Sequence, residues 1–384
     1  MENSKIKANL IKILRGELIG DNYKAENLSD SEVLKIYELS KIHDLAHIVS
    51  GWCFKNGVTP QNTAVFMQNQ VFALERYEQL KIALLGVTET LESEKIPFIP
   101  LKGSVLRDYY PIPSMRTSCD IDVLVRKSDL KRAEQVLIEK LSYAPFHRDT
   151  HDIAFKTPNG VNVELHFDLI EKDVVGLSEK PLKNVWKTAV LKKDSSYHYL
   201  LPDEVFYYYH IVHMAKHFLL GGSGIRSIMD VWVLNNKVSF DKEKRDSLLK
   251  KGNLLTFASK IEELSEIWFG TANANEDFSD VEQYIIFGGT YGNIQNQAII
   301  KSKAKNHKVK YLLSRIWVPY NTLKFEYPSL NGRRYLILFY QIKRWFKFIF
   351  LGKKRREQQK EINSVVTDTA QKTAGEMLDF LGLE

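Results

Sequence analysis

Two aspartates that lie two residues apart in an apolar segment are the side chains of this sequence most suited to chemistry. They are Asp120 and Asp122, in the segment CDIDVLV at 119–125, which reads as a strand. Side chains two apart in a strand project from the same face. Two carboxylates this close repel each other unless a cation neutralises them. Mg²⁺ binds oxygen ligands beside substrate phosphates, so the pair predicts a magnesium site, although D-x-D also occurs without a metal.

A glycine–serine pair precedes the aspartates and is suited to holding a phosphate. Gly103 and Ser104 follow the short apolar segment IPFIPL at 96–101, which reads as a strand, and Ser104 lies 16 residues before Asp120. Glycine lets a backbone come close to a phosphate, and the amide hydrogens at a helix start point toward it. The serine hydroxyl can donate a hydrogen bond to a phosphate oxygen. A tight turn with an N-cap serine is the alternative interpretation.

A third acid, Glu164, lies between apolar neighbours in the segment VNVELHF at 161–167. By the two-residue period of a strand, His166 and Asp168 share its face. Three carboxylates around one or two cations match phosphoryl and nucleotidyl transfer, where the metals stabilise the attacking and leaving oxygens of an in-line displacement. One of the acids can also accept the proton of the attacking hydroxyl.

These segments together resemble the nucleotidyltransferase superfamily, which has a polymerase beta-like fold. Its mark is h-G-[GS], then h-[DE]-h-[DE]-h, then h-[DE]-h, where h is an apolar residue. The chain resembles the bacterial family of uncharacterised nucleotidyltransferases more closely, through LKGSVLRDYYPIPSMRTSCDIDVLV, VELHFDL, and the later HIVHMAKH and GIRSIMDVWVL. This similarity extends from about Val33 to Trp345.

The resemblance implies roles for named residues. Asp120, Asp122 and Glu164 would be the catalytic acids and the ligands of Mg²⁺, with Mn²⁺ as the alternative ion. A nucleoside triphosphate would be the substrate, with Gly103 and Ser104 holding its phosphates.

Four further residues are candidates for the nucleotide site. Lys102 and Arg116 are expected to be cationic partners of the phosphates, although the superfamily pattern has an apolar residue in place of Lys102. By spacing alone, a surface charge is the alternative for either residue. Arg226 and Asp230 would line the nucleotide cleft from the C-terminal side. Because they are four apart on a predicted helix, a structural ion pair between them is the alternative.

The elements that must position these residues predict an α+β fold with three regions. Residues 1–95 read as helical, with a capping box of Ser29 and Glu32 opening a helix that ends at Asn56-Gly57, and a second helix over 61–94. Residues 96–200 form the expected catalytic core, a small mixed sheet with a helix beginning at Ser128 or Asp129 and a hairpin at Pro158-Asn159-Gly160. Residues 201–384 read as helical.

Two groups of histidines suggest other metal chemistry. His210, His213 and His217 share one face of a predicted helix and could bind zinc or iron, whereas helix packing or substrate contact is the alternative. His43-Asp44 with His47 is similar to the His-Asp pair of HD-type metal phosphohydrolases. The same segment also fits an amphipathic helix.

The charge is concentrated near the C-terminus. The net charge is +7, but residues 301–356 hold 16 Lys and Arg against one acid, and the rest of the chain has a balance of −8. This stretch, with the aromatic and basic segment 335–356, offers a surface to a nucleic acid or an anionic membrane. A packed helix with a solvated basic extension is the alternative.

Composition limits the classes that remain. No apolar run reaches the ~18–20 residues of a membrane helix, the N-terminus has no signal-peptide core, and two cysteines make no disulfide framework, so a cytoplasmic protein is expected. We expect a Mg²⁺-dependent nucleotidyltransferase that moves a nucleoside monophosphate to a hydroxyl acceptor, which the sequence does not identify, and releases pyrophosphate. The alternatives are an inactive nucleotide- or RNA-binding protein on the same scaffold and a metal phosphohydrolase using His43 and Asp44.

Overall fold

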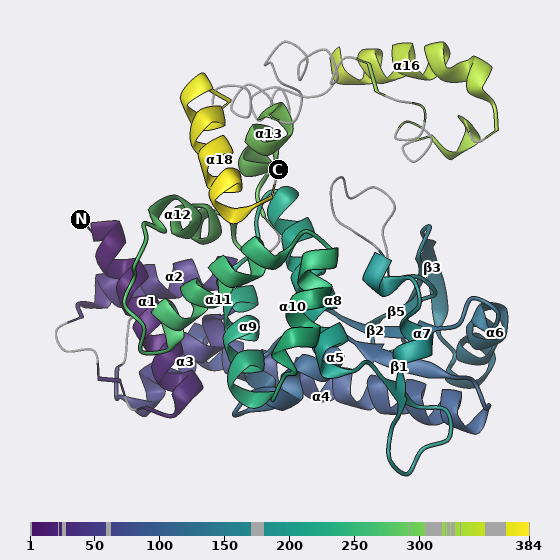
Figure 1. Cartoon of the computed structure of the whole chain (residues 1–384), viewed down its shortest axis with the longest axis horizontal. Coiled ribbons are helices and arrows are strands. Elements are labelled where there is room, and N and C mark those ends of the chain that lie inside the picture. The colour runs from purple at the N-terminus through teal and green to yellow at the C-terminus, as the bar shows by residue number, and fades with distance from the viewer. Residues whose placement is uncertain are drawn as a thin grey trace.

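The computed structural model describes most of the chain. The residues outside the description are 1, 22, 25–27, 59–62, 170–179, 291, 304–316, 319, 321–322, 324–326, 331, 350–365 and 384. Much of the basic stretch 301–356 therefore lies outside the described residues. Figure 1 shows helices from both ends of the chain packed beside the strands of the middle region. In the described residues these strands form a main sheet of five strands and a second sheet of two.

Four helices form the N-terminal region: α1 (Glu2–Ile19), α2 (Asp30–Ile42), α3 (Ala46–Lys55) and α4 (Thr63–Ser93). The predicted capping box is confirmed, since Ser29 accepts from the Glu32 amide and the Glu32 side chain accepts from Ser29. The single helix expected from Ser29 to Asn56 is wrong, because the chain turns between α2 and α3. There Asp44 has a left-handed backbone, with φ of 58°, which ends a right-handed helix.

The central sheet has the order β1-β2-β5-β4-β3. Its strands are β1 (Phe98–Leu101), β2 (Asp120–Val125), β3 (Ala144–Arg148), β4 (Asp152–Lys156) and β5 (Asn162–His166). Only β2 and β5 pair in parallel, so the sheet is mixed as expected. The β4–β5 hairpin at Pro158-Asn159-Gly160 is also confirmed. The sequence reading missed β3, because its five residues are all exposed at the sheet edge and show no alternation.

One face of the sheet is covered by two helices. The C-terminal half of α4 and the helix α6 (Leu130–Leu141) pack there with Ile121, Val123 and Val163. Figure 1 shows α4 below the sheet, reaching across to it from the N-terminal helices. The opposite face carries Leu101 and Leu124 into the larger helical core. The alternating positions of β2 thereby turn Asp120 and Asp122 toward this second face.

Short elements complete the core region. They are α5 (Gly103–Leu106), η1 (Arg107–Tyr109), η2 (Pro113–Met115), η3 (Lys180–Leu182), α7 (Val185–Thr188), β6 (Val190–Leu191) and β7 (Tyr199–Leu200). The two-stranded sheet of β6 and β7 was not expected from the sequence. Strands of two residues are too short to show a hydrophobic period.

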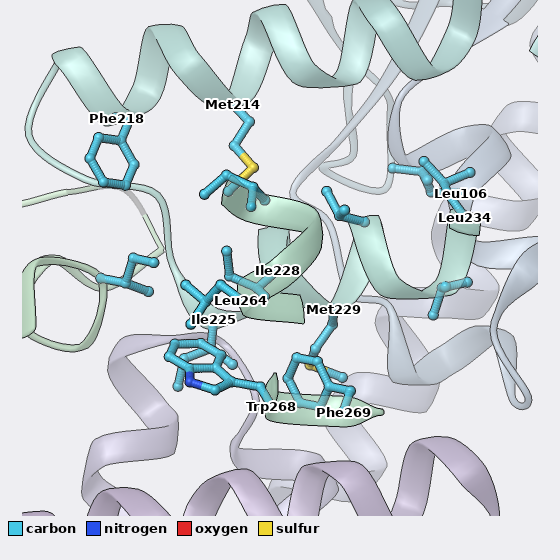
Figure 2. Close-up of a cluster of buried hydrophobic side chains, with 14 of the residues drawn as sticks. Leu106, Met214, Phe218, Ile225, Ile228, Met229, Leu234, Leu264, Trp268 and Phe269 are labelled. Carbon is cyan, nitrogen blue, oxygen red and sulfur yellow. The ribbon is translucent and has the colours of Figure 1, made fainter. Parts of the chain in front are cut away.

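The C-terminal region is helical: α8 (Asp203–Leu219), α9 (Ile225–Lys237), α10 (Lys242–Lys251), α11 (Leu255–Phe269), α12 (Ser279–Gly288), α13 (Ile294–Lys303), η4 (Pro328–Leu330), η5 (Arg334–Leu336), α16 (Ile337–Ile349) and α18 (Asp368–Leu381). Its buried side chains join those of the N-terminal helices in one core. Figure 2 shows Met214 and Phe218 of α8 pointing toward α9, with Trp268 and Phe269 of α11 below and Leu106 of α5 beside Leu234. Among the described residues, none of the helices combines the length and apolar character that crossing a membrane requires.

Candidate active site

The three predicted acids lie on two neighbouring strands. In the parallel pairing of β2 with β5, Asp122 is opposite Glu164 and Asp120 is opposite Asn162. Asp122 is 1% exposed and Glu164 is partly buried. All three side chains belong to the sheet face that α4 and α6 leave free. The strand register, which no single segment of sequence contains, thus brings Asp122 and Glu164 together.

One oxygen of Asp122 has two nitrogen partners. Lys102 Nζ donates to Asp122 Oδ1 at 2.7 Å, and His166 Nε2 lies 2.8 Å from the same oxygen. His166 Nε2 is also 3.4 Å from Glu164 Oε2. Potential ligand atoms of Asp122, Glu164 and His166 all lie within 4.8 Å of one another. The sequence placed His166 on the face of Glu164 but did not name it as a site residue, although the two-residue period was a sufficient signal.

Crowded charges shift the pKa values in this cluster. Burial, and then the neighbouring charge of Asp122, raise the pKa of Asp120 to about 6. Burial alone raises the pKa of Asp122 too, but the Lys102 ammonium and the His166 hydrogen bond outweigh it and lower that pKa below its ordinary value. For Lys102, burial lowers the pKa, yet the charge of Asp122 holds it well above its ordinary value. Asp122 and Lys102 are therefore a charged pair. The negative charge of Asp122 in turn raises the pKa of Asp120.

The glycine–serine pair follows β1 immediately. Lys102 has a φ of 45° and begins the short helix α5, which turns the chain sharply away from the strand. A Cβ at Gly103 would lie 2.9 Å from Arg116 Nη1, so only glycine fits against that guanidinium. Ser104 is 5% exposed and its Oγ has no hydrogen-bond partner. A buried hydroxyl without a partner is unusual and points to a group that the structure does not contain.

The alternative interpretation of Arg226 and Asp230 as an ion pair with each other is wrong, because each pairs with another residue. Asp230, on α9, accepts from Arg116 at 3.2 Å and 3.0 Å and from the Tyr110 hydroxyl at 2.7 Å. Arg226 Nη1 instead donates to Asp44 Oδ2 at 2.7 Å and to the Thr117 carbonyl at 3.0 Å. The i,i+4 spacing would allow Arg226 to pair with Asp230, but in the folded chain residues of other segments bind both side chains. Both arginines thereby connect α9 to the segment 116–118, which leads into β2.

Arg116 faces a different partner from the one the sequence suggested. Its guanidinium is paired with Asp230 and also donates to the Thr117 carbonyl. Burial lowers the pKa of Arg116, but the charge of Asp230 more than compensates and raises it. The charge of Arg116 still lowers the pKa of Asp120, so it acts on the acids from a distance.

Within the residues that the structure describes, His43 and Asp44 belong to no cluster of metal-binding side chains. His43 Nδ1 accepts from the Ile225 amide at 3.2 Å, so the ring proton is on Nε2, which faces the Ile286 carbonyl at 3.1 Å. Burial lowers the pKa of His43 to about 4. Both ring nitrogens thus form hydrogen bonds with backbone groups, and this neutral histidine connects α2, α9 and α12. His47 likewise contacts a backbone carbonyl, that of Met115, at 3.1 Å.

The histidines of α8 lie inside the molecule. His213 Nε2 is 3.2 Å from His217 Nε2, and His210 is buried. Burial, and then the charge of Lys102, lower the pKa of His213 well below its ordinary value. Within the part of the chain that the structure describes, none of the three belongs to a cluster of metal-binding side chains.

The family model described as uncharacterised nucleotidyltransferase matches residues 28–270. The chain belongs to this family. Neither a curated protein nor a solved structure matches it. The nucleotidyltransferase family accounts for the mixed sheet with helical flanks, and it indicates nucleotidyl transfer as the general class of reaction.

Proposed function

We propose that this protein is a Mg²⁺-dependent nucleotidyltransferase that transfers a nucleoside monophosphate from a nucleoside triphosphate to a hydroxyl group of an acceptor. The observation that carries the proposal is the parallel register of β2 and β5, which sets Asp122 beside Glu164 with Asp120 on the same face. The unpartnered Ser104 hydroxyl and the Lys102 ammonium lie at the end of the adjacent strand. Acids and phosphate-binding groups are thus neighbours in space.

The residues fit a divalent cation. Three carboxylates supply the oxygen ligands that Mg²⁺ and Mn²⁺ prefer. The raised pKa of Asp120 reflects charges that a bound cation would neutralise. Asp120, Asp122 and Glu164 would hold the ion, whose charge, when it is bound, would stabilise the negative charge of the phosphates.

Lys102, Gly103 and Ser104 would hold the triphosphate. The Ser104 hydroxyl is a hydrogen-bond donor without an acceptor, which a phosphate oxygen would provide. The missing side chain of Gly103 leaves the turn close to Arg116 and Ser118. Lys102, bound to Asp122 at 2.7 Å, could shift its ammonium to a phosphate when a cation neutralises the aspartate.

In the reaction, the acceptor oxygen would form a bond to the α-phosphorus. The bond from that phosphorus to the oxygen bridging to the β-phosphate would break, and pyrophosphate would leave with the electron pair. The hydroxyl proton would pass to one of the three carboxylates. The protein would contribute chiefly orientation and charge stabilisation.

The test is transfer of label from the α-phosphate of each of the four nucleoside triphosphates to a panel of sugars, aminoglycosides, RNA ends and proteins. We expect an acceptor to retain α-label and never γ-label, with release of pyrophosphate. Asp122→Asn should lower the rate at least ~100-fold. Asp129→Asn, at the N-cap of α6 and beyond the end of β2, is the matched control and should leave the rate unchanged.

Nucleotide binding gives a readout that needs no acceptor. A non-hydrolysable triphosphate should bind in the presence of Mg²⁺ and bind more weakly to Asp122→Asn. Binding without any transfer would favour an inactive nucleotide-binding protein, whereas phosphate release without a labelled acceptor would indicate a phosphohydrolase. Unchanged transfer by Asp122→Asn would refute the catalytic assignment.

A further inference from the structure

A second group of metal-binding side chains lies on the sheet beside the three acids. It consists of His151, Asp152 and His166, whose potential ligand atoms all lie within 4.8 Å of one another. Asp152 begins β4 and is opposite His166, the last residue of β5, in the antiparallel register. The His151 carbonyl accepts from the Phe167 amide at 2.9 Å, so the backbone holds both sides of the group together.

One atom of this group is buried without a partner. Asp152 is 7% exposed, and its Oδ1 has no hydrogen-bond partner. Its other oxygen, Oδ2, is 3.4 Å from His151 Nε2. A carboxylate oxygen withdrawn from water in this way is costly unless a proton or a cation satisfies it. Because the two residues beside Asp152 are histidines, the missing partner fits a metal ion.

We propose that His151, Asp152 and His166 bind a transition-metal ion of the Zn²⁺ class, separate from the magnesium site. Two imidazoles and one carboxylate are donors that suit Zn²⁺, Fe²⁺ or Co²⁺, whereas Mg²⁺ prefers oxygen and water. Ligands at ~2.0–2.1 Å around a tetrahedral ion are about 3.4 Å apart. The contact between His151 Nε2 and Asp152 Oδ2 already has that length. Three protein ligands would leave a fourth position open.

His166 connects the two sites. Its Nε2 lies 2.8 Å from Asp122 Oδ1, and the same ring belongs to the group with His151 and Asp152. The rings of His151 and His166 have centroids 5.7 Å apart. An ion bound by this group would fix the His166 ring and so hold its contact with Asp122. An ion bound at the second site would therefore influence Asp122, on which the proposed reaction depends. The second site itself is inferred without reference to that reaction.

The test is metal binding by the full chain after removal of metals with a chelator. Co²⁺ is titrated in the presence of excess Mg²⁺, and Zn²⁺ is then used to displace it. We expect one equivalent of Co²⁺ with the strong visible absorption of four-coordinate cobalt. His151→Gln and Asp152→Asn should each weaken binding by at least ~10–100-fold, because each removes a ligand.

Three controls separate this site from its surroundings. His147→Gln removes an exposed histidine on the neighbouring strand β3 and should leave Co²⁺ binding unchanged. Cys119→Ser tests the exposed thiol, and Asp122→Asn tests the magnesium site. Circular dichroism and the midpoint of urea unfolding show that each variant is folded.

Metal-edge X-ray absorption of the wild-type protein loaded with Zn²⁺ provides a measurement without variants, and it should show two imidazoles in the ligand shell. The proposal is overturned if the wild-type chain binds no Co²⁺ or Zn²⁺, or if the ligand shell lacks imidazole. It is also overturned if both His151→Gln and Asp152→Asn bind as the wild type does, or if only Asp122→Asn or Cys119→Ser abolishes binding. These outcomes are independent of nucleotide transfer, so they leave the proposed function to be judged by its own test.

Discussion

At the residue scale, the sheet face that carries the acids is held together by one buried charge pair. Asp122 is 2% exposed in its side chain and Lys102 is 21% exposed, so neither charge is well hydrated. Breaking such a pair by removing one partner leaves an uncompensated charge in the interior. Lys102 therefore stabilises the aspartate in the absence of a divalent cation, in addition to its expected role at the phosphates.

Lys102→Met should lower the free energy of unfolding by about 3 kcal/mol in a metal-free buffer, because Asp122 keeps only His166 as a partner. Millimolar Mg²⁺ should recover part of this loss, since the ion replaces the missing charge. Urea unfolding with and without Mg²⁺ measures both effects, and Lys127→Met at an exposed position is the control. Equal stability of Lys102→Met and the wild type would contradict the pair.

Two serines near the same turn provide a matched comparison. Ser104→Ala removes a buried hydroxyl that has no partner, so stability should stay unchanged or rise by about 1 kcal/mol. Ser118→Ala removes the oxygen that accepts from Arg107 Nη2 at 2.9 Å and should cost ~1–3 kcal/mol. Triphosphate binding should fall about tenfold for Ser104→Ala alone, as a lost hydrogen bond to a charged oxygen predicts. Calorimetric titration and thermal unfolding distinguish the two variants; normal nucleotide affinity of Ser104→Ala would argue against the phosphate role.

At the element scale, α9 is fixed to the segment before β2 by the ion pair of Arg116 with Asp230 and by the hydrogen bond from Arg226 to the Thr117 carbonyl. Arg226 also pairs with Asp44 at the turn between α2 and α3, and Asp44 accepts from the Thr117 hydroxyl at 2.7 Å. The segment 116–118 leads directly to Asp120, so the position of the acids depends on contacts with both helical regions. The geometry of the acids on the sheet therefore requires both helical regions.

Arg116→Met should destabilise the protein by about 3–5 kcal/mol, because Asp230 is buried and, among the described residues, would keep only the Tyr110 hydroxyl as a hydrogen-bond donor. The double variant Arg116→Met with Asp230→Leu should lose less, since no buried charge remains unpaired. Denaturant unfolding of the wild type, the two single variants and the double variant forms a double-mutant cycle that measures the coupling free energy of the pair. Additive losses would show that the pair contributes no coupling.

At the scale of the whole molecule, one neutral histidine joins helices from both ends of the chain. His43 ends α2, accepts from the first residue of α9 and contacts the Ile286 carbonyl of α12. A Cβ at Gly224 would lie 3.0 Å from the His43 ring, so the ring packs closely against the backbone of Gly224. The fold therefore requires His43 in its uncharged form.

The pH dependence of stability follows with a definite sign. The pKa of His43 is about 4 in the folded protein against an ordinary ~6.5 in the unfolded chain, so the unfolded state binds the extra proton between these values. The contribution of His43 is fully present above pH ~6.5 and is lost as the pH falls toward 4, by ~2–3 kcal/mol. Urea unfolding at pH 7 and pH 4.5 should show that the free energy of unfolding falls less between these pH values for His43→Gln than for the wild type. An equal loss in both would contradict a buried neutral His43.

The sequence by itself determined the local features, because each depends on neighbours in the chain. The capping box at Ser29, the hairpin at Pro158-Asn159-Gly160 and the alternation that puts Asp120 and Asp122 on one face were all readable from short segments. The edge strand β3 was not, since an exposed strand lacks the apolar alternation that marks one.

Only the tertiary structure decided which side chains meet. The register of β2 with β5 places Asp122 beside Glu164, and His166 of β5 contacts Asp122 as well. The packing of α9 pairs Asp230 with Arg116 and Arg226 with Asp44. Sequence spacing shows which pairs one element permits, such as Arg226 with Asp230, but not which partners other elements bring closer. Buried charges associate with the partners that packing places nearest, and that choice exists only when the whole chain is folded.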